Sequence, residues 1–257
     1  MVSVLIPTTT GGFKYISKLV PLLKKQITEV NGEILIAVNG ANDGTEEYLR
    51  NQKIFFISLP RNTTFSQANN KLAQVAKNDL LLLNNDTETP DGFLKKMSDE
   101  FQSKKEYSIM GCTIYRLSDK RCHHAGVYFT EQGIPYELGL PVGDINGIPN
   151  TDPRVKTSRE VPSVTGACMM IRKELYKKLG GLDEHYFTGW EDTDFVLRAR
   201  EKGEKVWYCA EAHIYHHHFG SRDQGRLQHE LQNRQFYDSV WVHTGRAIQI
   251  LRKDNFL

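Results

Sequence analysis

The sequence has few cysteines and prolines and carries little net charge. Four of its 257 residues are cysteine and nine are proline, and no two cysteines form a C-x-x-C pair. Such scattered cysteines indicate reduced thiols rather than a disulfide framework, and they offer no closed four-ligand spacing for zinc. The 33 Lys and Arg residues nearly balance the 31 Asp and Glu residues, for a net charge of +2 at pH 7. This balance argues against nucleic acid or an anionic membrane as the main partner.

Long apolar runs and a secretion signal are also missing. No stretch reaches the roughly 18 consecutive apolar residues of a membrane span. The N-terminus begins with the apolar run 2–6 and lacks the basic region that opens a signal peptide. With 39% hydrophobic and 25% charged residues, the composition is typical of a folded globular protein. We expect a cytoplasmic protein, with contact at the inner face of the membrane left open.

Apolar runs alternate with helical patterns through the first hundred residues. Continuous apolar strands separated by helices predict a parallel sheet covered on both faces, in a doubly wound α/β fold. Ligands of such sheets bind beyond the carboxyl ends of the strands, and here each of those ends is followed by polar residues. The four expected strands are Val2–Ile6, Glu33–Val38, Ile54–Leu59 and Leu80–Leu83.

The pattern changes after residue 107, where strands, a long loop and further helices are expected. The predicted elements are the strands Tyr107–Tyr115 and Val127–Phe129, the loop 139–160, and the helices Ile171–Leu179, Asp192–Lys202 and Gln224–Ile250. We find no internal repeat and no linker. We therefore expect one catalytic domain, residues 1–223, with a helical extension, residues 224–257, packed on it.

Two acidic segments and a histidine cluster could carry chemistry. Asp86 lies just beyond a run of four leucines, where its carboxylate could hold Mg²⁺ or Mn²⁺ against a diphosphate or could cap a turn. Glu191 and Asp192 lie at the start of a predicted helix, where a carboxylate could act as a general base or cap the helix. Alternate residues of a strand share a face, which would place His216 and His218 together. The residues alone leave these alternatives open.

Motif-like segments follow one another along nearly the whole chain, from about residue 2 to 240. They are VSVLIPT (2–8), NGANDGT (39–45), NNDT (84–87), TGACMMIR (165–172), GGLDE (180–184), WEDTD (190–194), LRAR (197–200) and AHIYHHHFGS (212–221). In this order they resemble the family-2 glycosyltransferases with the GT-A fold, in particular the bacterial rhamnosyltransferase-like members that build surface polysaccharides. The resemblance implies a GT-A fold, a Rossmann-like and mostly parallel sheet flanked by helices with a helical C-terminal tail.

The same resemblance implies a function and a set of site residues. The function is a metal-dependent, inverting transfer of a sugar from a UDP- or dTDP-sugar to a hydroxyl of a glycan or lipid-linked glycan, with Mg²⁺ or Mn²⁺ as cofactor. Asp192, helped by Glu191, would be the catalytic base. The metal would be held by Asp86, His216, His218 and Asn84. The nucleotide would be bound by Pro7, Thr8, Asn39, Asp43, Asn70 and Asn85, and the donor or acceptor sugar by Gly166, Ala167, Trp190 and Arg222.

Two other functions could use the same residues. A sugar nucleotidyltransferase could hold its metal with Asp86, but the chain lacks the glycine- and lysine-rich phosphate loop expected near the N-terminus. A nucleotide-sugar-binding module without turnover is suggested by Asn84, which stands where the D-x-D motif has its first carboxylate. The C-terminal segment could pack on the catalytic domain, form a dimer or rest on a membrane surface to meet a lipid-linked acceptor.

Overall fold

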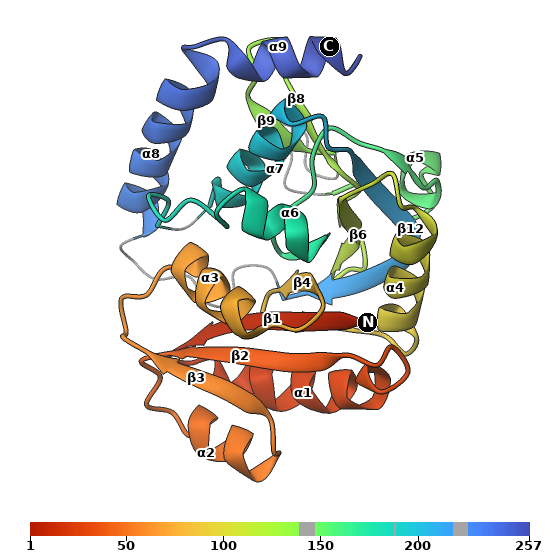
Figure 1. Cartoon of the computed structure of the whole chain (residues 1–257). Coiled ribbons are helices and arrows are strands. Elements are labelled where there is room, and N and C mark those ends of the chain that lie inside the picture. The colour runs from red at the N-terminus through yellow and green to blue at the C-terminus, as the bar shows by residue number, and fades with distance from the viewer. Residues whose placement is uncertain (139–146, 188, 218–225) are drawn as a thin grey trace.

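The computed structural model describes residues 1–138, 147–187, 189–217 and 226–257, and in these ranges the chain forms a mixed sheet covered by helices (Figure 1). The main path of the sheet is β10-β12-β6-β11-β4-β1-β2-β3, with β5 (Thr87–Glu88) paired to β12 and β7 (Cys122–His124) paired to β6. In path order the strands are β10 (Arg159–Glu160), β12 (Val206–His216), β6 (Ile109–Arg116), β11 (Cys168–Ile171), β4 (Asp79–Leu83), β1 (Val2–Thr9), β2 (Glu33–Asn39) and β3 (Phe55–Leu59). A separate hairpin joins β8 (Val127–Phe129) to β9 (Pro135–Glu137).

The N-terminal half is the doubly wound unit that the apolar runs predict. Strands β4, β1, β2 and β3 are parallel neighbours, and helices cover both of their faces because side chains alternate along each strand. Leu81 and Leu83 face the core that includes α1 (Phe13–Ile27) and α4 (Phe93–Ser103), whereas Leu80 and Leu82 face the core under α3 (Phe65–Val75). Figure 1 shows α1 and α3 on opposite sides of β1. The short helix α2 (Thr45–Asn51) follows β2.

The central strand β11 was not predicted; it lies just before the helix predicted over Ile171–Leu179, with which it shares only Ile171. Residues Cys168–Ile171 pair antiparallel with both β4 and β6, and the predicted helix follows as the slightly shorter α6 (Lys173–Lys178). All four residues of β11 are buried. A run of four buried apolar residues has no period that separates a strand from a helix, so the neighbouring strands decide its structure.

The C-terminal segment turns back on itself and does not form one continuous helix. Helix α8 (Arg226–Tyr237) runs into a π-helical turn (Asp238–Val242), and α9 (Arg246–Lys253) begins after Gly245, whose φ is 70°. Trp241 and Leu251 are fully buried in a cluster with Leu197 of α7 (Glu191–Glu201). This tail therefore packs on α7 and on the β8–β9 hairpin. The predicted boundary at residue 223 lies outside the described residues.

Within the described ranges, no helix is both long enough and apolar enough to cross a membrane. The remaining helix, α5 (Pro153–Lys156), is a single turn beside β12.

Candidate active site

The carboxyl ends of β1 and β4 bring two of the predicted nucleotide-binding residues together. The Asn85 amide donates from Nδ2 to Oγ1 of Thr8 at 2.8 Å, and both side chains are buried. A Cβ on Gly12 would lie 2.1 Å from that Thr8 oxygen and 2.9 Å from the Asn85 nitrogen. Only glycine therefore allows the turn after β1 to cover this pair. Pro7 lies within β1, opposite Ala37 of β2.

Asp86, which is buried, and His216, which is half-buried, are 130 residues apart in sequence and form a pair. Nε2 of His216 is 2.9 Å from Oδ1 of Asp86, and the Nδ2 atom of Asn84 is 3.5 Å from the same His216 nitrogen. Strand β5 holds the pair in register, because Thr87 lies opposite His216 of β12. Burial raises the pKa of the Asp86 carboxyl, but the hydrogen bond and charge of His216 outweigh burial and hold it below its usual value.

The donor atoms of this pair fit a divalent cation. A carboxylate oxygen suits Mg²⁺ or Mn²⁺, and an imidazole nitrogen is a ligand that first-row transition ions accept. The His216 nitrogen and the Asp86 oxygen approach closely enough to face one ion. Among the described residues no group of three or more His, Cys, Asp or Glu gathers as a metal site. His218, the fourth predicted metal residue, lies outside the described residues.

Asp192 lies in the first turn of α7, where four donor groups from three residues hold its carboxylate. Oδ2 accepts from the Gly166 backbone at 2.7 Å and from the Thr165 hydroxyl at 3.2 Å, and Oδ1 accepts from the Thr193 backbone at 2.7 Å and from the Thr193 hydroxyl at 3.4 Å. These four hydrogen bonds match the about four lone-pair positions of a carboxylate, and the longest of them, from the Thr193 hydroxyl, is the one that a substrate hydroxyl would displace. Trp190 precedes the helix with a φ of 77°. This backbone conformation is uncommon for a bulky residue, and such conformations are concentrated at functional sites.

Residues 165–167, just before β11, connect the Asp86–His216 pair to Asp192. The Ala167 carbonyl accepts from the Asn84 backbone at 3.0 Å, while the neighbouring Gly166 donates to Asp192. Gly166 and Ala167 are residues that the motif predicts as sugar contacts, whereas Thr165, the first residue of the same motif, was not predicted. A hydroxyl next to a predicted substrate-contact glycine was the available signal. This short segment thus joins the proposed metal pair to the proposed base.

Asn39 and Asp43, both predicted to bind the nucleotide, differ in the hydrogen bonds that their side chains make. Nδ2 of Asn39 donates to the Thr63 carbonyl at 3.3 Å, which leaves Oδ1 buried without a hydrogen-bond partner. Asp43 accepts from the backbone of Gly11 at 2.8 Å and from the Thr45 hydroxyl at 2.5 Å. Burial acts to raise the pKa of Asp43, and these hydrogen bonds reverse that effect and lower it. Asp43 therefore ties the turn after β1 to the start of α2.

Asn70 lies on α3 and uses its amide within the protein. Nδ2 donates to the Leu182 carbonyl and to Glu184, each at 2.9 Å, and Oδ1 accepts from Tyr176 at 2.6 Å. These contacts fasten α3 to the segment after α6. The predicted contact of Asn70 with the nucleotide stays a prediction. Glu191, predicted to help the catalytic base, is buried at the start of α7, and its role also stays a prediction. Arg222, predicted to contact the donor or acceptor sugar, lies outside the described residues.

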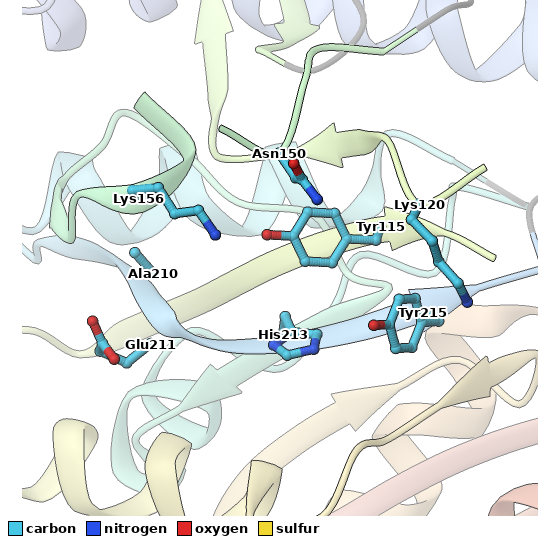
Figure 2. Close-up of a pocket in the computed structure, with 8 residues that line it drawn as sticks. All are labelled: Tyr115, Lys120, Asn150, Lys156, Ala210, Glu211, His213 and Tyr215. Carbon is cyan, nitrogen blue, oxygen red and sulfur yellow. The ribbon is translucent and has the colours of Figure 1, made fainter. Parts of the chain in front are cut away.

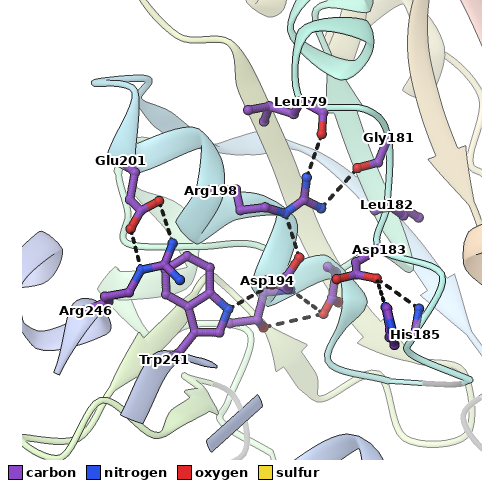
Figure 3. Close-up of polar contacts among 12 residues, drawn as sticks. Leu179, Gly181, Leu182, Asp183, His185, Asp194, Arg198, Glu201, Trp241 and Arg246 are labelled. Atoms are coloured by element: carbon purple, nitrogen blue, oxygen red, sulfur yellow. Dashed lines mark hydrogen bonds and ion pairs between the residues drawn. The ribbon is translucent and has the colours of Figure 1, made fainter. Parts of the chain in front are cut away.

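A buried polar network holds α7 against the tail (Figure 3). Asp194 accepts from Trp241 Nε1 at 2.8 Å and from Arg198 Nε at 2.7 Å. Arg198 also donates to the carbonyls of Leu179 and Gly181 at 2.9 and 3.0 Å. The third carboxylate of the WEDTD motif is therefore structural, and it fixes the helix whose first turn carries Asp192.

Two family profiles match the chain. Residues 3–180 match the family described as Glycosyl transferase family 2. Residues 145–219 match a profile described as the N-terminal domain of galactosyltransferase. The two matches together cover the Asp86–His216 pair and Asp192.

Two curated relatives of the chain have names that refer to glycan synthesis. The O-antigen biosynthesis protein RfbC of Myxococcus xanthus is 32% identical over 158 residues, which are 60% of this chain but only 12% of that protein. The low-salt glycan biosynthesis hexosyltransferase Agl10 of Haloferax volcanii is 23% identical, over 82% of this chain and 67% of its own length. The chain thus spans a small part of RfbC and about two thirds of Agl10.

Solved glycosyltransferase structures share the fold. GalNAc-T7 with UDP, GalNAc and Mn²⁺ superposes with a TM-score of 0.68 at 15% identity, over 84% of this chain and 43% of that one. The mannosyltransferase PcManGT from Pyrobaculum calidifontis, in complex with GDP-Man and Mn²⁺, gives 0.61 at 14% identity, over 90% and 62%. The predicted GT-A fold, with a mostly parallel sheet and a helical C-terminus, is confirmed.

Proposed function

Because the chain belongs to glycosyl transferase family 2, we propose that it transfers a sugar from a UDP- or dTDP-sugar to a hydroxyl of a surface glycan, with inversion at the anomeric carbon. The observation that carries this proposal is the link through residues 165–167. It joins a carboxylate–imidazole pair at the nucleotide edge of the sheet to a separately held carboxylate on α7. The names of the relatives support glycan synthesis as the setting.

Asp192 is the base in this mechanism. One carboxylate oxygen accepts the proton of the acceptor hydroxyl while the hydroxyl oxygen forms a bond to the anomeric carbon. The bond from that carbon to the diphosphate oxygen breaks on the opposite side, and its electron pair leaves with the nucleoside diphosphate. A single displacement of this kind inverts the anomeric centre and requires one base. The donors from Thr165, Gly166 and Thr193 keep the carboxylate aimed in one direction.

Asp86 and His216 would hold the divalent cation, with Asn84 beside them. When bound, the cation offsets the negative charge that develops on the departing diphosphate. The buried and unpartnered Oδ1 of Asn39 is suited to accept the N3–H of uracil or thymine. His218 and Arg222 stay predictions for the same diphosphate.

The acceptor is proposed to be a glycan chain, free or linked to a lipid. The apolar face of α9 is not free to lie on a membrane, because Ala247, Ile250 and Leu251 are buried against the rest of the protein. A cytoplasmic location, with contact at the inner face of the membrane, stays a prediction.

Substitution of Asp192 tests the assignment. We expect Asp192→Asn to lower sugar transfer by roughly 10²–10⁴-fold, the usual contribution of a general base, while UDP binding measured by calorimetry is retained. The matched control is Asp99→Asn, which removes an exposed carboxylate paired with Lys95 on α4 and should leave transfer unchanged.

A donor screen supplies the activity for that comparison. UDP- and dTDP-sugars are offered with Mn²⁺ and a set of glycoside acceptors, and mass spectrometry identifies the products. A nucleoside diphosphate with a new glycoside supports the transferase. Release of inorganic diphosphate from a nucleoside triphosphate and a sugar phosphate would identify a nucleotidyltransferase instead. UDP binding without turnover on any donor would identify a binding module, and full activity in Asp192→Asn would refute the base.

A further inference from the structure

A hollow lined by aromatic and charged side chains lies between β6, β12 and the segment that contains α5. Its volume is about 370 Å³. In Figure 2, Tyr115 and His213 lie in its middle, Lys120 lies beside Tyr215 at one end, and Lys156 and Glu211 lie at the other. None of these residues belongs to the site described above.

An irregularity in β12 directs the aromatic side chains into the hollow. The pairing of β12 with β6 shifts between Cys209 and His213, and such bulges change the face toward which a side chain points. Beyond the shift, His213 and Tyr215 lie on one face while Ile214 is buried in the core on the other. His216, the next residue, contacts Asp86. The side chains that line the hollow and the His216 side chain that contacts Asp86 therefore lie on opposite faces of the same end of β12.

The rings form one continuous surface. The centroid of Tyr115 is 5.4 Å from that of His213 and 6.0 Å from that of Tyr215, and the last two are 5.5 Å apart. Aromatic faces carry negative charge density, which suits the apolar and weakly positive C–H face of a pyranose ring. Burial raises the pKa of Tyr115 to about 12, so its hydroxyl stays protonated and can donate to a sugar oxygen.

Two lysines place positive charge at the two ends of the hollow. Lys120 Nζ lies 3.9 Å from the centroid of the Tyr215 ring, and Lys156 enters from the last turn of α5. Lys120 has a φ of 59°, a conformation that costs free energy in a residue other than glycine and that is concentrated at functional sites. Burial, together with the charges of Lys96 and Lys156, lowers the pKa of His213, which favours a neutral ring.

We propose that this hollow is a second carbohydrate subsite, which binds an acidic pyranose unit of the glycan, one that carries a carboxylate or a phosphate. Tyr115 and His213 contact the sugar ring, and the ammonium group of Lys120 binds the anionic group, away from the end of the hollow where Glu211 lies beside Lys156. The assignment rests on the proposed function, because it names the kind of glycan that the enzyme extends. The donor diphosphate is held on the other face of β12, so the two ligands would not compete.

Isothermal titration with simple sugars tests the subsite. The probes are methyl α-D-glucuronide and α-D-glucose 1-phosphate, with methyl α-D-glucoside as the neutral analogue, each titrated into the chain already saturated with UDP and Mn²⁺. We expect at least one anionic probe to bind about tenfold or more tightly than the neutral glucoside, as one charge-assisted hydrogen bond would produce. Preference for the glucuronide or for the sugar phosphate identifies which anion the hollow accepts.

Variants locate the binding. Lys120→Ala should remove most of the preference for the anionic probe, and Tyr115→Ala should weaken all three probes alike. Lys104→Ala is the matched control, because Lys104 also lies over an aromatic ring of β12, 4.5 Å from Trp207, but outside the hollow. It should leave every affinity unchanged.

Two results would overturn the proposal. One is equal affinity for anionic and neutral probes, and the other is an affinity that Lys120→Ala does not change. UDP binding, titrated separately in each variant, shows whether the chain is folded and whether the donor site works. If neither UDP nor dTDP binds while the glucuronide, titrated into the nucleotide-free chain, binds at the hollow, the transferase proposal fails and the carbohydrate subsite stands.

Discussion

The contact between Trp241 and Asp194 allows a quantitative prediction about how the tail holds α7. The indole nitrogen donates to Oδ1 of Asp194 at 2.8 Å, and both side chains are buried. A hydrogen bond to a charged partner contributes about 1.5–3 kcal/mol, against about 0.5–1.5 kcal/mol for a neutral one. Trp241→Phe keeps an aromatic ring but loses this donor, so we expect the free energy of unfolding to fall by at least ~2 kcal/mol. The melting temperature should fall by about 2–4 °C for each kcal/mol.

A double-mutant cycle separates the hydrogen bond from the lost ring volume. Trp241→Phe is measured alone and in an Asp194→Asn background, by urea unfolding followed by circular dichroism. Asparagine keeps an acceptor oxygen but carries no charge, so the loss in that background should be about 1 kcal/mol smaller. Equal losses in the two backgrounds would refute the idea that the buried charge gives this contact its strength.

The pH dependence of the same variant gives an independent check. Burial raises the pKa of Asp194, while Arg198 and the Trp241 donor oppose that effect. A carboxyl whose pKa is higher in the folded state than in the unfolded chain reduces stability as the pH rises past the unfolded value, about 3.9. Removal of the indole donor raises the folded pKa further. The loss caused by Trp241→Phe should therefore be larger at pH 7.5 than at pH 4.5, and the opposite order would contradict this assignment.

Three further predictions concern buried or site residues. Burial lowers the pKa of His123 to about 4. Between pH 6.5 and 4 the unfolded chain therefore binds a proton that the folded chain does not, and the wild type should lose up to about 3 kcal/mol of stability. His123→Gln should show a smaller loss in urea titrations, and identical pH slopes in the two proteins would argue against this role of His123. His216→Ala should abolish the tightening of UDP binding by Mn²⁺ in calorimetry while UDP alone still binds, and an unchanged response to Mn²⁺ would exclude His216 as a ligand. Asn39→Ala should weaken UDP binding about tenfold, the effect of one hydrogen bond in a buried setting, and unchanged affinity would remove Asn39 from base recognition.

Local patterns were sufficient for the doubly wound half of the fold. The run Leu80–Leu83 reads as a strand buried on both faces because its alternate leucines face two different helical layers, and a fully apolar run is what such a position requires. The first turn of α7 was also predictable, because acidic residues favour helix N-termini. The strand at Cys168–Ile171 was not, since its antiparallel pairing with β4 and β6 depends on residues about 60 to 90 positions away.

The candidate site shows the same division. The order of the motifs, through the family resemblance, predicted site roles for Asp86, Asp192 and His216, because each residue type suits one chemical task. Which atoms meet was decided only in three dimensions. His216 reaches Asp86 because β5 pairs with the end of β12, and Asp192 is held by Gly166 because β11 enters the sheet beside β4.

The sequence by itself therefore supplied the candidate groups of the proposed site: a carboxylate and an imidazole for a cation, a second carboxylate for a proton, and an amide for the nucleotide base. The tertiary structure decided that Asp194 is a structural anchor rather than a catalytic group, although it is two residues from Asp192 in the same motif. It also decided that Tyr115, His213 and Tyr215 share one hollow. Sequence patterns report local periodicity, whereas these contacts depend on strand order, register and a shift in one strand, which are set by packing between distant parts of the chain.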